Sequence, residues 1–129
     1  MPLAQHVFGA GLAALVLLVT PMRKPETPRW AASCAQAADA ALHQQGPDVA
    51  RAILAQCLGP ERLSSVPRGD RVLLLRVAGD IERLASRGSE AEKHYRSALR
   101  EAAPESHALA GEIVRAHVGL ALIAQMLSE

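Results

Sequence analysis

Two cysteines are the residues whose type and spacing define the sharpest chemistry in this 129-residue chain. Cys34 lies 12 residues before Gly46, and Cys57 lies 11 residues after it. Gly46 followed by Pro47 is typical of a helix end and a helix start, so the sequence predicts antiparallel helices over 31–45 and 47–58. In such a pair the cysteines differ in height by about 1.5 Å. They are therefore expected to face one another closely enough to form a disulfide.

A bond between Cys34 and Cys57 would enclose 22 residues. Closing a loop of that length stabilises a fold by about 3 kcal/mol, and disulfides persist in oxidising compartments. The alternatives are two buried free thiols that behave as small apolar side chains, or thiols used for metal ligation or catalysis. The disulfide interpretation places the domain outside the cytoplasm.

The other residues with catalytic or metal-binding chemistry are scattered. Of all the histidines, His107 and His117 lie closest together in the sequence, and they are ten residues apart. Two metal ligands on one helix face lie three or four residues apart. The chain has no glycine-rich phosphate loop, nucleophile elbow or haem-attachment motif. We therefore predict no enzymatic activity, no catalytic residues, no cofactor and no metal site.

The composition predicts an all-α fold. Half of the residues are hydrophobic and only 2% are aromatic, which is typical of closely packed helices with short side chains and unlike a β-sandwich or barrel. From residue 31 onward, 11 Lys and Arg face 12 Asp and Glu, a charge of −1. Without a basic surface, nucleic-acid binding is not expected.

The first 20 residues predict a transmembrane anchor or a signal segment. Residues 7–19 contain no polar side chain, and residues 3–20 as a helix reach about 27 Å, close to the thickness of a hydrocarbon core. A buried helix of a soluble fold is the alternative. Residues 21–30 form a Pro-rich linker, and residues 31–129 form the helical domain.

The membrane orientation is open. Arg23, Lys24 and Arg29 follow the apolar segment, which places the domain in the cytoplasm by the positive-inside rule. The cysteine pair favours the periplasmic side, which we expect for a single-pass protein. Residues 31–34, Ala-Ala-Ser-Cys, resemble a lipobox, so a lipidated or exported chain is an alternative to an uncleaved anchor.

Three further helices are predicted. One spans 71–87 and ends at Gly88. The next begins with a capping box of Ser89 and Glu92 and breaks at Pro104. The last spans 105–127, and its apolar residues alternate by four and three. The domain is thus expected to hold five antiparallel helices.

Two hairpins share one pattern of small and bulky residues. In the first the pattern is Ala38, Ala50, Leu54 and Cys57, and in the second it recurs at the same offsets as Gly79, Ala91, Tyr95 and Ala98. This pattern resembles the tetratricopeptide repeat (TPR), and Gly119 lies where a third unit would begin. The resemblance covers residues 72–104 well and the remainder of 31–129 loosely, with a longer period than the family has. It implies a short helical array that binds protein segments, and no catalytic residues.

The last helix indicates an interface. Between residues 118 and 127 only Gln125 is polar, and large apolar surfaces mark binding sites. We expect a partner to contact Tyr95, Leu120, Ile123 and Leu127, unless this helix is buried internally.

These observations predict a non-catalytic, membrane-anchored protein-interaction module. It would be an accessory or assembly subunit of a larger bacterial membrane complex, held in the membrane by residues 3–20 and bound to other subunits or to itself. The alternative is a stand-alone exported or lipidated α-helical envelope protein.

Overall fold

The structure is a computed structural model, and it describes residues 30–58 and 63–128. These residues form five α-helices and two short 3₁₀ helices, with no strand among them. The predicted anchor and nearly all of the linker lie outside the described residues. The α-helices are α2 (Trp30–Gln45), α3 (Pro47–Cys57), α4 (Arg68–Leu84), α5 (Gly88–Ala102) and α6 (Ala110–Ser128); the 3₁₀ helices are η2 (Leu63–Ser65) and η3 (Ala103–Glu105).

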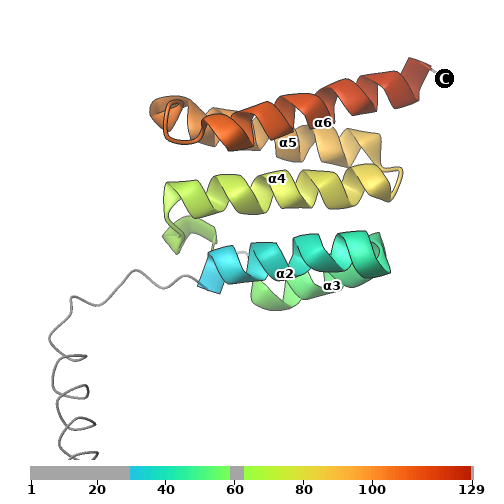
Figure 1. The fold of residues 1–129 in the computed structure, drawn as a ribbon, viewed down its shortest axis with the longest axis horizontal. Coiled ribbons are helices and arrows are strands. Elements are labelled where there is room, and N and C mark those ends of the chain that lie inside the picture. Colours follow the sequence, from blue (N-terminus) through green and yellow to red (C-terminus); the bar gives the residue numbers. More distant parts are fainter. Residues whose placement is uncertain (1–29, 59–62, 129) are drawn as a thin grey trace, which may run out of the picture.

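The helices are arranged in two layers. Helices α2, α4 and α6 lie side by side in one layer, with α3 and α5 behind them (Figure 1). α2 pairs with α3 and α4 pairs with α5, and α6 packs on both helices of the second hairpin. Because α4 contacts all four other α-helices, it is the central element, and it has little surface left for water.

Small side chains fill the contacts between these helices. Alanines of α2 and α3 pack on Leu74, Val77 and Ile81 of α4, and alanines of α5 pack on Val72. An alanine side chain has few atoms to bury, but it lets the axes of neighbouring helices approach closely. The core therefore consists of closely spaced helices with small side chains between them. Trp30 packs at the edge of the first cluster, as expected if it docks on the domain.

The five predicted helices are confirmed, and three of their ends are corrected. α4 begins at Arg68 and ends at Leu84, three residues earlier at each end than predicted. Gly88 begins α5 and does not end α4. The turn is made instead by Ser86, which has a positive φ of 63°. The predicted capping box at Ser89 is wrong, because the residue before α5 is Arg87 and no side chain caps that end.

The last helix also starts later than predicted. Residues 103–105 form a 3₁₀ helix around Pro104, and residues 106–109 form a turn. The break at Pro104 is therefore longer than its sequence indicates, and α6 begins only at Ala110.

Candidate functional site: a charged groove across α2, α4 and α6

The predicted cysteine pair is bonded. Cys34 in α2 and Cys57 in α3 form a disulfide with their Cα atoms 6.0 Å apart, which confirms the facing positions expected from the hairpin. Neither sulfur is a free thiol, so neither is available in this state for metal ligation, catalysis or lipidation of Cys34. The bond closes the first hairpin next to the segment that leads into the domain.

Tyr95 joins the two layers. It is fully buried, and its ring lies between Gly79 of α4 and Gly119 of α6. A Cβ atom built on either glycine would come within 2.6 Å of a ring carbon of Tyr95. The two glycines therefore leave a slot through which a side chain from the back layer reaches between two helices of the front layer.

The hydroxyl of Tyr95 ends among charged groups of α4. It donates a short hydrogen bond to Asp80 and accepts one from Arg83 Nε at 3.2 Å. Asp80 in turn accepts a hydrogen bond from Arg76 Nη1 at 2.8 Å. The phenol is thus one member of a polar network on the α2–α4–α6 side of the molecule.

Arg76 is the centre of that network, and only 5% of its side chain is exposed. Besides Asp80, its guanidinium contacts Glu112 of α6 at 2.7 Å and Asp39 of α2 at 3.7 Å. Burial lowers the pKa of Arg76, but the hydrogen bonds that its guanidinium donates to Glu112 and Asp80 outweigh this effect, and the net pKa is raised. Arg76 is therefore a permanent cation that ties three helices together.

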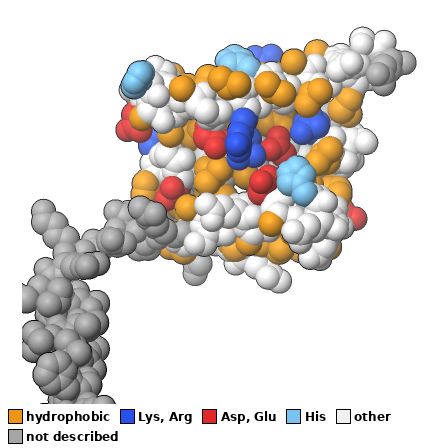
Figure 2. Space-filling model, in the orientation of Figure 1, with side chains coloured by type: hydrophobic (Ala, Val, Ile, Leu, Met, Phe, Trp, Pro, Cys, Tyr) orange, Lys and Arg blue, Asp and Glu red, His pale blue; other side chains and the backbone are white. Residues whose placement is uncertain are grey.

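Two adjoining hollows lie over this network, and together they form what we call the charged groove. The hollow of about 400 Å³ is bounded by His43, Arg83 and Val118, and the hollow of about 250 Å³ by Gln36 and Glu112. Asp39, Arg76 and Arg115 line both. Figure 2 shows acidic and basic side chains gathered here, with hydrophobic ones around them.

The groove offers both signs of charge to a ligand. Three arginines (Arg76, Arg83, Arg115) balance three carboxylates (Asp39, Asp80, Glu112). Arg115 is exposed and has no ion pair with any residue that the structure describes. Because cations and carboxylates lie side by side, the groove presents both hydrogen-bond donors and acceptors.

The pKa of Tyr95 is raised above its ordinary value. Burial is the larger cause and the hydrogen bond to Asp80 adds to it, while Arg83 opposes both. The folded state therefore holds this proton more tightly than the unfolded state does. The stability linked to it is fully present below about pH 10 and is lost as the pH rises above that value, by up to about 1.4 kcal/mol per pH unit.

Alkaline titration tests this linkage directly, because Tyr95 is the single tyrosine of the chain. We expect tyrosinate absorbance to appear only together with the loss of helical circular dichroism. In Tyr95→Phe, the steep loss of stability above about pH 10 should be reduced. Ionisation near pH 10 with intact helices would contradict the buried phenol.

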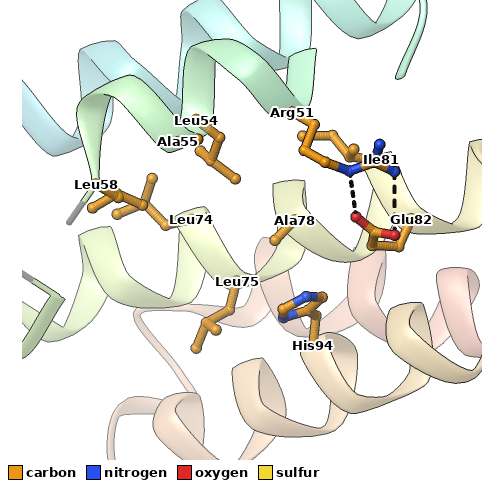
Figure 3. A pocket seen from close by; sticks show the side chains of 10 residues that line it. All are labelled: Arg51, Leu54, Ala55, Leu58, Leu74, Leu75, Ala78, Ile81, Glu82 and His94. Atoms are coloured by element: carbon orange, nitrogen blue, oxygen red, sulfur yellow. Dashed lines mark hydrogen bonds and ion pairs between the residues drawn. The ribbon is translucent and has the colours of Figure 1, made fainter. Parts of the chain in front are cut away.

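A second cavity lies on the other side of α4, between α3 and α5. This apolar cleft has a volume of about 290 Å³, and Figure 3 shows aliphatic side chains of α3 and α4 facing it, with His94 of α5 at its wall. At one end, Arg51 donates two hydrogen bonds to Glu82, at 2.9 and 3.3 Å. These charges neutralise one another, so the cleft has little polar chemistry with which to orient a ligand.

The residues predicted to contact a partner are only partly placed for it. Tyr95 and Ile123 are buried inside the domain, and their contact with a partner stays a prediction. Ile123 points inward because α6 uses Ala116, Gly119 and Ile123 against the second hairpin. Leu120 is half-buried and Leu127 is exposed. The last helix is therefore buried on the face that carries Ile123 and exposed at Leu127, so internal burial and an exposed apolar surface describe different parts of it.

The charged residues of the groove were missed by sequence reasoning. In the sequence, Arg76 and Asp80 lie outside the apolar positions of their helix, as charged residues do on any amphipathic helix. The available signal was their spacing of four residues, which permits an intrahelical ion pair. Nothing local indicated that Glu112 and Asp39 would join them.

The comparisons with known proteins add no relative. The chain matches no protein-family model, no curated protein and no solved structure. Within the described residues no three His, Cys, Asp or Glu side chains are grouped to hold a metal ion. One described helix, α6, is long and apolar enough to cross a membrane by length and composition, and 17% of its apolar window is buried.

Proposed function

We propose that this chain is a non-catalytic, membrane-anchored protein-interaction module, an accessory subunit of a larger bacterial membrane complex, which binds a segment of another subunit in the charged groove. The observation that carries the proposal is the groove itself. Its two hollows share Asp39, Arg76 and Arg115 and extend across three helices. That extent suits an extended polypeptide better than a small metabolite.

The packing of Tyr95 supports a TPR-like interpretation of the array. In that family, small residues let the helices of a hairpin approach, and the bulky residue fills the space between them. Gly79 meets the ring of Tyr95 in this way, and Ala91 and Ala98 are buried beside it. A TPR-like array would present the face of α2, α4 and α6 to its ligand.

The disulfide supports a periplasmic domain, since such bonds persist in oxidising compartments. With residues 3–20 in the membrane, the groove would be held at a fixed distance from neighbouring subunits. Tethering of this kind raises the local concentration of a binding site without any new contact, so a groove of modest affinity would be sufficient for assembly.

Native mass spectrometry of the full chain extracted from its own membranes in mild detergent tests the proposal. The groove variant is Gln36→Glu with His43→Glu, two exposed positions on the α2 wall. The control is Lys93→Glu, which shifts the net charge equally on α5, where the Lys93 side chain is 71% exposed. We expect the wild type and the control to arrive with larger subunits, and the groove variant to arrive alone.

Circular dichroism establishes that the groove variant is folded. If the folded variant stays bound to the same subunits as the wild type, the groove is not the binding surface. If the wild type itself arrives alone, trimmed or lipidated, the chain is a stand-alone envelope protein and the accessory-subunit proposal is wrong.

A further inference from the structure

One face of α6 is apolar and uncovered. Within the described residues, most of the exposed large hydrophobic side chains belong to this helix. Four of them are spaced by four residues and form what we call the α6 ridge, which consists of Val114, Val118, Leu122 and Met126. Val114 and Val118 are 60% and 51% exposed, so half or more of each side chain contacts water.

The position of α6 in the array explains the uncovered face. α4 is covered on one side by the first hairpin and on the other by α5 and α6. α6 packs on α4 and α5 through Ala116, Gly119 and Ile123, and no described helix lies on its other side. A polar outer surface is usual for the last element of a helical array, whereas the outer surface of α6 is apolar.

The ridge has the geometry of a helix–helix contact. Side chains spaced by four residues form a continuous ridge along a helix, and such ridges make the contacts in the commonest class of helix packing. The ridge is symmetric about residue 120. Across a two-fold axis at that point, Val114 lies opposite Met126 of a second copy, and Val118 lies opposite Leu122. Each pair joins a smaller side chain to a larger one.

The charges along α6 permit this pairing. Residues 118–128 contain no charged side chain. Arg115 is the charge nearest to the ridge, and the same two-fold axis places it opposite the neutral amide of Gln125 of the second copy. No like charges oppose one another, and Arg115, which has no ion pair within the described domain, gains an acceptor.

We propose that the α6 ridge is the contact through which two copies of this chain pair in antiparallel fashion about a two-fold axis near residue 120. This goes beyond the proposed function, because it concerns a second copy and not another subunit. Insertion of α6 into a bilayer is the less consistent use of this helix, since withdrawing Ala116, Gly119 and Ile123 from the domain would uncover the ring of Tyr95.

The size of the ridge sets the expected strength. Stable interfaces bury about 800 Å² on each partner, and a ridge of four residues on one helix offers less. We therefore expect a reversible dimer whose population rises with concentration, and whose formation in a membrane is assisted by confinement of the chains to one surface.

Sedimentation velocity of the full chain in mild detergent, over a range of protein concentrations, tests the pairing. We expect a monomer–dimer equilibrium for the wild type. Val118→Asp with Leu122→Asp places four carboxylates in the contact and should weaken it by at least about tenfold. The control is Val49→Asp with Leu84→Asp, two exposed apolar positions away from α6, which should associate as the wild type does.

Cross-linking tests the register. The native cysteines are bonded to one another, so a cysteine introduced at an exposed site reacts separately from them. A mixture of Val118→Cys and Leu122→Cys chains should form a mixed disulfide faster than a mixture of Val118→Cys and Val49→Cys chains. Equal rates would contradict the two-fold axis near residue 120.

Two further outcomes would overturn the proposal. One is a wild type that stays monomeric at every concentration, which leaves the ridge to another protein or to lipid. The other is a ridge variant that is folded by circular dichroism and still dimerises, which places the contact elsewhere. Val118 and Leu122 also line the larger hollow of the charged groove, so the groove itself is judged by the variant Gln36→Glu with His43→Glu, whose positions lie on α2 and outside the ridge.

Discussion

Replacing Arg76 by methionine is expected to lower the free energy of unfolding by about 3 kcal/mol, the lower end of the range for breaking a buried ion pair. Methionine fills a similar volume but leaves the carboxylates of Asp80 and Glu112 facing one another without their shared cation. Their side chains are 16% and 22% exposed, so water restores part of the lost solvation and keeps the effect from being larger.

Urea unfolding of the full chain in mild detergent, followed by circular dichroism, measures this loss. Arg115→Met is the matched control, because Arg115 lines the same groove but is exposed and has no ion pair within the described part of the chain; it should change stability by no more than about 0.5 kcal/mol. Adding Glu112→Gln to Arg76→Met should recover part of the loss. If the two arginines prove equally dispensable, the buried network does not hold the three helices together.

The second large effect is expected from Gly119→Ala. The new methyl group would come within 2.6 Å of a ring carbon of Tyr95, and the ring cannot withdraw because Gly79 contacts its other side. Overpacking of a core costs about 1–3 kcal/mol. We expect a net loss of about 2 kcal/mol even though alanine favours a helix more than glycine does.

Gly111→Ala in the same helix is the control for Gly119→Ala. A Cβ at Gly111 meets nothing within 4 Å, so this change should be neutral or stabilise the helix by up to about 1 kcal/mol. In a Tyr95→Leu background the cost of Gly119→Ala should fall, because the ring is gone. An unchanged cost in that background would show that the ring is not the obstacle.

Features fixed by local geometry could be predicted from the sequence. The facing positions of Cys34 and Cys57 follow from a helix end at Gly46 and from the rise per residue, neither of which depends on the rest of the fold. This prediction needed only one hairpin. Gly79 and Tyr95 were marked by a pattern that two hairpins share and by its resemblance to a repeat family, and in the fold the ring of Tyr95 lies against Gly79.

Features that depend on how hairpins stack could not be predicted in this way. Arg76 has the spacing of a solvated helix face, and it is buried because α4 is surrounded by the other four helices. The inward direction of Ile123 likewise depends on which side of α6 meets α5. The end of α4 at Leu84, three residues earlier than predicted, has another cause, since the turn at Ser86 uses a residue that rarely adopts positive φ and gives little sequence signal.

The placement of the disulfide has a consequence for the chain under tension. A pull applied between Trp30 and Ser128 would pass through the sulfur atoms from Cys34 to Cys57, and the 22 residues enclosed by the bond would bear none of it. At about 3.5 Å per extended residue, the disulfide prevents the enclosed segment from adding roughly 80 Å to the length of the stretched chain. The first hairpin is thereby shielded from mechanical unravelling, and the load falls on α4, α5 and α6, whose contacts are noncovalent.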